Sequence, residues 1–347
     1  MNRKNNNILV ITDGSWDHAS SRTRALLYFN YFKLQLNLSI KWIPRIPQKK
    51  QTGLYKWFIF PLLKRFLFCK LFFYILLFQF DVVFVQRYFL SAFLLRILKK
   101  KRSKIIYDFD DAIYLDKPGE HKNTDKTTRM VNAADQIIIS SAELAPFCRS
   151  SGNEKIEIIT TPVEPEKFKI HTPHLNQPIV IGWIGSSYTT PYLKLIESAL
   201  QEIKRNFDIK LLLIGADPTY RIAGVPIEVV SWNLAKEAEH MDMMDIGIMP
   251  LTSDGYSKGK GGYKLFQYMA AGIPVVASPV GINSEIVIEN QNGFLAERSE
   301  DWIKSVTYLI ENSAERERMG KIGRRYVEEK YSREVNFKLL YKIIKSI

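Results

Sequence analysis

The sequence predicts an α/β protein built from two doubly wound domains that face each other across a cleft. Short apolar runs alternate with helix-length amphipathic segments along the chain, a pattern typical of parallel sheets covered by helices on both faces. The 347 residues suit two domains of ordinary size, and the 46% of hydrophobic residues can fill two cores. This composition excludes a disordered or collagen-like chain.

Twelve short apolar runs predict the strands. The first half contains six of them, at residues 8–12, 38–42, 81–86, 104–108, 136–140 and 157–160. The second half contains six more, at residues 179–185, 209–215, 227–230, 245–250, 274–277 and 293–296. Helices are expected in the gaps between them.

The domain boundaries follow from composition. Residues 171–178 are polar, contain two prolines and precede a new strand, so they form the best linker. We therefore assign residues 1–173 to an N-terminal domain and residues 174–330 to a C-terminal domain. Apolar residues at helical spacing predict a helix in residues 331–347, and its apolar face should pack back on the body of the protein.

The chain is strongly basic, and the excess charge is confined to its first half. It carries 49 Lys or Arg against 36 Asp or Glu, for a net charge of +13. Residues 1–175 hold 28 basic and 15 acidic side chains, whereas residues 176–347 hold 21 of each. We therefore expect the N-terminal domain to meet an anionic partner.

Residues 54–80 combine many Phe and Leu side chains with four Lys or Arg residues. These charges interrupt the segment too often for a spanning helix, which needs about 20 mostly uncharged residues. A helix lying in the membrane interface fits better. The alternatives are a buried helix whose lysines reach the surface and, least favoured, a true span. Because no nucleic-acid-binding motif is present, we expect residues 41–104 to contact an anionic membrane rather than nucleic acid.

The cysteines and the N-terminal residues indicate in which cellular compartment the protein is expected. Cys69 and Cys148 cannot form a disulfide framework and lack a metal-binding spacing, which favours a reduced cytoplasmic protein. The apolar run at residues 8–11 is too short for the core of a signal peptide. Together with the basic segment, this predicts a cytoplasmic protein that is peripheral at the inner face of the membrane.

The most informative segment spans residues 245–285, where a predicted strand, a loop and a helix follow one another. The loop contains four glycines, Gly255, Gly259, Gly261 and Gly262. Glycines let the backbone approach a ligand, and the amides at a helix N-terminus attract anions. Lys260 and Lys264 are four residues apart, so both can lie on one face and neutralise a diphosphate. No Ser or Thr follows either lysine as in a Walker A motif, and a solvated glycine loop is the alternative.

A second loop suited to phosphate follows the first strand of the C-terminal domain. It contains Gly185, Ser186 and Ser187. Ligands of open α/β sheets bind outside the carboxyl ends of the strands, so this loop should face the same cleft as Lys260. Alone it is more often just a turn, but two such loops in one domain strengthen the prediction.

Ordered motifs in the second half resemble the nucleotide-sugar half of family 4 glycosyltransferases. They are IGWIGS at 181–186, Trp232, DIG at 245–247 with Pro250 and Leu251, GKGGYKL at 259–265, QYMAAGIPVVA at 267–277, Gly281 with Glu285, and NGF at 292–294. The resemblance runs nearly continuously from about residue 179 to 330. Enzymes of that family have the GT-B fold, in which two Rossmann-like domains face each other and the second holds the donor.

The resemblance implies a set of donor-binding residues. These are Gly185, Ser186, Ser187, Trp232, Lys260, Gly261, Gly262, Tyr263, Lys264, Gln267 and Glu285. It also implies a retaining transfer from a nucleotide diphosphate sugar to a lipid-linked or polysaccharide acceptor in cell-surface glycan synthesis. Lysines and loop amides would stabilise the diphosphate, so no metal and no cofactor is expected. Typical members carry two glutamates eight residues apart where this chain has Gly259 and Gln267, and Gln267 can still bond a ribose hydroxyl.

Three carboxylates follow a predicted strand of the first domain, at an edge that should face the cleft. Because Asp108, Asp110 and Asp111 lie within four positions, they are costly unless paired or solvated. We predict that Asp110 and Asp111 orient the acceptor hydroxyl and that Arg22 contacts donor phosphate or acceptor. The alternative is a structural network in which these carboxylates pair with Arg22, Arg24 or Arg87. His18 is expected to be a surface histidine.

Two competing functions use the same features. A nucleotide-sugar epimerase with the GT-B fold would keep the donor loops but would need no membrane-facing domain. A catalytically silent relative, acting as a membrane-bound partner in polysaccharide assembly, is compatible with Gly259 and Gln267.

Overall fold

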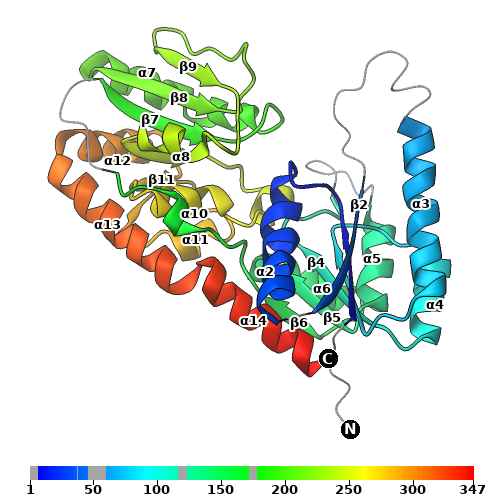
Figure 1. Cartoon of the computed structure of the whole chain (residues 1–347). Coiled ribbons are helices and arrows are strands. Elements are labelled where there is room, and N and C mark those ends of the chain that lie inside the picture. The colour runs from blue at the N-terminus through cyan, green and yellow to red at the C-terminus, as the bar shows by residue number, and fades with distance from the viewer. Residues whose placement is uncertain (1–6, 37, 46–59, 116–122, 172–177) are drawn as a thin grey trace. The chain divides into compact units, whose positions relative to one another are not determined.

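The computed structural model describes residues 7–36, 38–45, 60–115, 123–171 and 178–347. The chain forms two compact units (Figure 1). The first comprises Met1–Thr161, Gly259–Gly261 and Asn336–Ile347, and the second comprises Pro162–Lys258 and Gly262–Val335.

The first unit contains a six-stranded parallel sheet in the order β2-β1-β3-β4-β5-β6. Its strands are β1 (Asn7–Thr12), β2 (Ser39–Pro44), β3 (Val82–Gln86), β4 (Lys104–Phe109), β5 (Gln136–Ile139) and β6 (Ile156–Ile158). Its helices are α1 (Ala19–Ser21), α2 (Leu27–Leu36), α3 (Phe60–Leu77), α4 (Ala92–Lys100), α5 (Thr124–Ala133) and α6 (Ala145–Ser150). All six strands predicted for this half are present at nearly the predicted positions.

Alternate residues of β1 face different helix layers. Leu9 and Ile11 belong to a core shared with α3, α4, α5 and α6, whereas Ile8 and Val10 belong to a core shared with α2. All four side chains are at most 1% exposed. A strand covered on both faces must be continuously apolar, which explains the uninterrupted run at these positions.

The C-terminal helix α14 (Arg333–Ser346) contributes to the first unit, although it is last in the chain. The ring of Phe337 lies 4.5 Å from that of Phe32 on α2, measured between centroids, and the ring of Tyr341 lies 5.7 Å from it. Leu340 and Ile344 are buried in the core that contains β1. Figure 1 shows α14 at the C-terminal end of the chain. The helix predicted in residues 331–347 therefore packs on the sheet formed by the start of the chain.

The second unit contains a parallel sheet in the order β12-β11-β10-β7-β8-β9. Its strands are β7 (Ile179–Ile184), β8 (Ile209–Ile214), β9 (Ile227–Val230), β10 (Ile246–Met249), β11 (Val275–Ala277) and β12 (Gly293–Leu295). Its helices are α7 (Glu197–Asn206), α8 (Glu237–Asp242), α9 (Gly255–Lys258), α10 (Tyr263–Ala270), α11 (Asn283–Ile286), α12 (Ser299–Glu311) and α13 (Ser313–Lys330). Helices α7 and α12 pack on one face of the sheet, and α10 and α13 pack on the other. The second unit is therefore doubly wound, as the sequence predicts.

The division between the units lies at Thr161–Pro162, earlier in the chain than the predicted boundary at residue 173. Val163 pairs with Ser332 in an isolated bridge, and Phe168 is buried in the core of the second unit. Apolar contacts therefore draw these residues into the second unit. Residues 172–177, in the middle of the predicted linker, lie outside the described residues.

Candidate functional site

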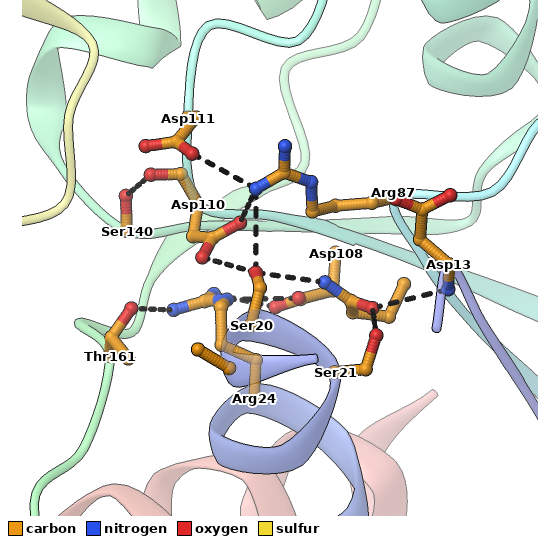
Figure 2. Close-up of polar contacts among 12 residues, drawn as sticks. Asp13, Ser20, Ser21, Arg24, Arg87, Asp108, Asp110, Asp111, Ser140 and Thr161 are labelled. Carbon is orange, nitrogen blue, oxygen red and sulfur yellow. Dashed lines mark hydrogen bonds and ion pairs between the residues drawn. The ribbon is translucent and has the colours of Figure 1, made fainter. Parts of the chain in front are cut away.

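A network of polar side chains lies at the carboxyl ends of the first sheet. Strand β1 lies between β2 and β3, so the order of strands along the chain reverses there. Doubly wound sheets bind ligands at such a switch point, outside the carboxyl ends of the strands. Asp13 follows β1, Arg87 follows β3 and Asp110 follows β4 at this edge (Figure 2).

Arg24 and Asp108 form a buried ion pair at the base of this edge. Arg24 lies in a π-helical turn (Arg22–Leu26) between α1 and α2. Its Nε atom donates to Asp108 Oδ1 at 2.9 Å and its Nη2 atom to Oδ2 at 2.5 Å, and both side chains are 2% exposed. Burial raises the pKa of Asp108 to about 6, and the Arg24 guanidinium opposes that rise. The Nη1 atom of Arg24 also donates to the carbonyl oxygen of Ile159, so the guanidinium ties α2 to two strand ends.

Arg87 bridges the two other carboxylates. Its Nη1 atom donates to Asp110 Oδ1 at 3.0 Å and to Asp111 Oδ2 at 2.9 Å (Figure 2). Its backbone φ is +51°, a left-handed conformation that costs free energy in a residue with a side chain. Burial alone would raise the pKa of Asp110, but Arg87 and Arg24 lower it below its ordinary value. Asp110 is therefore held as a carboxylate, fixed in position.

Serine and glutamine side chains complete the network. Ser20 donates its hydroxyl to Asp110, and Ser21 Oγ donates to Gln86 Oε1 at 2.9 Å. His18 caps the N-terminus of α1 by accepting from the Ser21 amide, and it is half-buried rather than a surface histidine. Burial and the charge of Arg87 lower the pKa of His18, which keeps it neutral near pH 7.

The predicted catalytic residues differ in their surroundings. Asp110 and Asp111 lie in the network, and the Asp111 side chain remains 28% exposed. Arg22 is buried, and its Nη1 atom donates to the carbonyl oxygen of Trp16 at 2.9 Å. Arg24 and Arg87 make the ion pairs to the three aspartates, as in the structural network weighed as the alternative. Among the described residues, no group of three His, Cys, Asp or Glu side chains is placed to hold a metal ion.

The second sheet has its own switch point, between β7 and β10. Gly185 follows β7 directly, and a Cβ atom there would lie 2.2 Å from Cη2 of Trp183, so only glycine fits. Ser186 and Ser187 come next and are exposed. The Ser186 amide donates to Thr189 Oγ1 at 3.1 Å, which closes the turn. These predicted donor residues therefore lie where doubly wound sheets bind ligands.

Helix α10 begins at the same edge of the second unit. Gly262 precedes it with φ +68°, and no side-chain hydrogen bond caps the helix, so the positive end of the helix dipole lies at this edge and attracts anions. The Nζ atom of Lys264 lies 4.3 Å from the centroid of the Trp183 ring, which is buried at the end of β7. This cation–π contact holds the Lys264 ammonium beside the loop that contains Gly185. Tyr263 is half-buried at the first position of the helix.

Gly259, Lys260 and Gly261 belong to the first unit. A Cβ atom on Gly259 would lie 2.7 Å from Cβ of Ala112, and one on Gly261 would lie 3.1 Å from Ser140 Oγ. A glutamate at position 259 would therefore find no room, which gives a steric reason for the departure from the family pattern. Lys260, between the two glycines, is half-buried.

The remaining predicted donor residues lie in the second unit. Trp232 is half-buried, and its Nε1 atom donates to Glu237 Oε2 at 2.6 Å. Gln267 lies inside α10 and is 3% exposed, whereas Glu285 is exposed on α11.

Sequence reasoning missed a hydrogen-bond cluster beneath the loop after β10. Asp254 accepts hydrogen bonds from the hydroxyl of Thr252 and from the amide and hydroxyl of Ser257. Tyr192 extends the cluster through a 2.8 Å contact between its hydroxyl and Ser257 Oγ. Burial alone would raise the pKa of Asp254, but these hydrogen bonds lower it. The TSDGYS run is a recognisable turn signal, but nothing in it indicates Tyr192 as a partner.

Replacing Gly262 by alanine is expected to lower the free energy of unfolding by about 2–4 kcal/mol. The left-handed φ costs about 1–2 kcal/mol for any residue with a Cβ atom, and overpacking adds to this. The new Cβ would lie 2.4 Å from Cδ1 of Ile286, which is fully buried. Gly224 is the matched control, because it has φ +76° with nothing within 4 Å of a Cβ. Gly224→Ala should cost only the conformational part, and equal losses in urea denaturation would show that the contact with Ile286 carries no cost.

Comparison with known proteins identifies a family match in the second half and relatives that cover about half of the chain. Residues 178–312 match the family described as "Glycosyl transferases group 1". A Bacillus subtilis protein called putative teichuronic acid biosynthesis glycosyltransferase TuaH is 30% identical over an alignment of 177 positions that covers 46% of this chain and 44% of that protein. The Staphylococcus aureus capsular polysaccharide biosynthesis glycosyltransferase CapM is 23% identical over an alignment of 194 positions that covers 52% of this chain and 49% of that protein. The chain thus spans about half the length of these two relatives.

Solved structures extend the likeness to nearly the whole chain. Anabaena Alr3699/HepE, solved in complex with UDP, is similar with a TM-score of 0.68 at 13% identity, over 98% of this chain and all of that one. At this identity the likeness shows the fold alone, which is that of GT-B glycosyltransferases.

Proposed function

We propose that this chain, whose residues 178–312 belong to the group 1 glycosyl transferases, transfers a sugar from a nucleotide diphosphate sugar to a glycan acceptor in cell-surface polysaccharide synthesis. The names of two relatives place them in teichuronic acid and capsule synthesis, which supports this acceptor class. The proposal extends from the second unit, where the family match lies, to the whole chain.

One observation carries the proposal. The uncapped start of α10, with Lys264 held against Trp183, lies at the carboxyl edge of the second sheet, where an anion is attracted by both the amides and the ammonium group. A diphosphate leaving group develops negative charge as the sugar departs. Preorganised donors stabilise that charge most strongly in the transition state, so this geometry suits diphosphate departure.

The proposed reaction retains the configuration at the anomeric carbon. The bond from that carbon to the diphosphate oxygen breaks, and a bond to the acceptor oxygen forms on the same face of the sugar. The acceptor proton passes to the departing phosphate, so no protein base is needed. We assign Asp110 and Asp111 to the orientation of the acceptor hydroxyl, because Arg87 fixes both carboxylates and Asp111 stays accessible.

The proposed acceptor is lipid-linked, and the protein is proposed to work at the inner face of the membrane as a peripheral protein. Exposed Leu and Phe side chains of α3 next to the basic residues of the first unit support this location. No described helix is both long enough and apolar enough to cross a bilayer.

Nucleotide sugars test the donor assignment. We expect UDP or GDP, alone or with a sugar, to raise the free energy of unfolding by about 2.7 kcal/mol when present at 100 times the dissociation constant. The corresponding nucleoside is the control, because it has the base and ribose but no phosphate. Differential scanning fluorimetry measures the shift, and equal shifts by nucleoside and diphosphate would contradict the phosphate site.

Product analysis separates the alternatives. A transferase consumes the donor only with an acceptor, and NMR of the product should show the same anomeric configuration as the donor. An epimerase would convert the donor sugar without any acceptor. A silent relative would bind the diphosphate and turn over neither.

A further inference from the structure

Helix α3 turns an apolar stripe toward solvent. The stripe has helical spacing and consists of Leu62, Phe66, Cys69, Phe73 and Leu77. Its leucine and phenylalanine side chains are, in chain order, 67%, 64%, 53% and 69% exposed. The opposite side of the helix, by contrast, is buried in the core of the first unit. Soluble proteins rarely expose such a contiguous apolar surface without a partner.

The surroundings of the stripe are almost free of negative charge. Between Asp17 and Asp108 the sequence has a single acidic residue, Asp81. Exposed basic side chains, among them Arg65 on α3 and Arg96 on α4, flank the stripe. A second copy of the chain would bring two cationic surfaces together, so the charge favours an anionic partner instead.

A pocket of about 520 Å³ opens at the amino-terminal edge of the first sheet, opposite the edge that carries Asp110. Its lining includes four basic residues, Lys99, Arg102, Lys104 and Lys155. The acidic residue in the lining is Asp135, which accepts from the Ile105 amide at 2.9 Å and lies 3.4 Å from the Lys104 ammonium. The pocket therefore carries an excess of positive charge.

The turn that lines the pocket also contacts the end of α3. The Lys101 ammonium donates to the carbonyl oxygens of Leu76 and Phe78 at 2.7 and 2.9 Å. The hydroxyl of Ser103, in the pocket lining, donates to the carbonyl oxygen of Phe80 at 2.8 Å. Apolar stripe and basic pocket are thus joined through residues 101–103.

Arg102 occupies a position at which glycine is the preferred residue. It follows the C-terminus of α4 with φ +58°; its amide donates to the Lys99 carbonyl oxygen and the Ser103 amide donates to that of Leu98. This hydrogen-bond pattern is the Schellman motif, in which glycine avoids the cost of the left-handed conformation. An arginine there brings a guanidinium to the pocket at a conformational cost.

We propose that this pocket binds the phosphate of an anionic membrane lipid while the apolar stripe of α3 enters the surrounding interface. The proposal rests on the membrane association proposed above and deepens it, because it names a headgroup site that includes Lys155, outside residues 41–104. Basic groups facing phosphate and aromatic groups among the headgroups are the two halves of a peripheral membrane contact.

Vesicle co-sedimentation tests the proposal with the full chain. The vesicles contain phosphatidylcholine alone or phosphatidylcholine with phosphatidylglycerol. Arg102→Gly/Lys155→Gln is expected to weaken binding to the anionic vesicles by more than about 25-fold, because each cation near the surface contributes about fivefold and the contacts inside the pocket add to this. Its thermal stability should not fall, since glycine suits the backbone at position 102. Arg65→Gln/Arg96→Gln is the matched control, with the same charge loss on the same surface but outside the pocket, and its binding should weaken by at most the about 25-fold expected from general attraction.

The other outcomes separate the parts of the proposal. Equal losses in the two double variants would overturn the headgroup site and leave a general electrostatic attraction.

Phe66→Ser/Phe73→Ser should also bind at least about tenfold more weakly, and unchanged binding would overturn the role of the stripe. Inorganic phosphate could raise the melting temperature of the wild type, but not that of the pocket variant, while no vesicle binds. In that case the pocket binds a soluble anion, and the assignment of a lipid headgroup is wrong. Sugar transfer to a soluble acceptor is measured in parallel. It distinguishes a failure of the proposed membrane contact from a failure of the proposed transferase function.

Discussion

Replacement of Arg24 by methionine is expected to lower the free energy of unfolding by about 3–5 kcal/mol, the largest stability effect among the changes considered. Both members of the Arg24–Asp108 pair are 2% exposed and joined by two hydrogen bonds. Removal of one partner leaves a buried carboxylate without compensation, and this costs more than the pair contributes. Chemical denaturation followed by circular dichroism measures the change.

The double variant Arg24→Met/Asp108→Leu is the control. An apolar pair of similar volume removes the buried charge, so most of the lost stability should return. If the single variant is too unstable to purify, the double variant still tests the argument. Recovery of less than about 1 kcal/mol in the double variant would show that packing, and not charge, is what Arg24 supplies.

The pH dependence of the Arg24 variant has a definite sign. Burial already raises the pKa of Asp108 to about 6, and without Arg24 the charge of Arg87 still opposes that rise but the ion pair and its hydrogen bonds no longer do. A carboxyl whose pKa is higher in the folded than in the unfolded state favours folding below its unfolded pKa, and this contribution is lost as the pH rises through its folded pKa. Because the Asp108 pKa lies higher in the variant than in the wild type, the deficit of Arg24→Met should shrink as the pH falls toward about 6 and stay level below it. A deficit that grows on acidification would contradict the assignment.

Lys264→Ala is expected to lower the rate of sugar transfer by about 100- to 1,000-fold, the loss typical of one preorganised charge-stabilising donor. The ammonium group lies against Trp183 at the start of α10, where the diphosphate is proposed to sit. Lys258→Ala is the matched control, since it removes the same charge from an exposed position at the end of α9, six residues earlier. Transfer kinetics and calorimetric titration with UDP or GDP provide the measurements.

The two measurements together locate the effect. A fall in kcat with unchanged nucleotide affinity places the Lys264 contact in the transition state, whereas weaker binding of the nucleotide places it in the ground state as well. Lys260→Ala is expected to weaken nucleotide binding too. Unchanged affinity in both variants would remove the donor site from this loop.

The strands and the two glycine loops could be predicted because their signals are local. Each buried strand is a short apolar run, and the glycines around Lys260 stand out against their neighbours. Gly185 directly follows β7, and Gly262 directly precedes α10 with a positive φ. The sequence indicated these two turns through backbone requirements that glycine alone meets easily, and donor binding at them stays a prediction.

The remaining features depend on distant contacts. The π-helical turn that carries Arg24 has no sequence signature, and its ion pair with Asp108 spans 84 positions. Arg87 reaches two carboxylates from a left-handed backbone conformation. A residue other than glycine gives no indication of that conformation in the sequence. The division at Thr161 arises because Phe168 packs in the second core, and a polar linker pattern cannot reveal that preference.

Helix α14 gives the chain an unusual order of completion during synthesis. The strand β1 and helix α2 leave the ribosome long before α14, yet Phe32 lacks part of its cover until Phe337 and Leu340 have been made. Almost the entire second unit is translated in that interval and can fold while the first sheet still lacks part of one face. Residues 1–161 expressed alone would therefore expose aromatic rings that the full chain hides, and a nascent chain cut short before residue 336 would carry the same aggregation-prone surface.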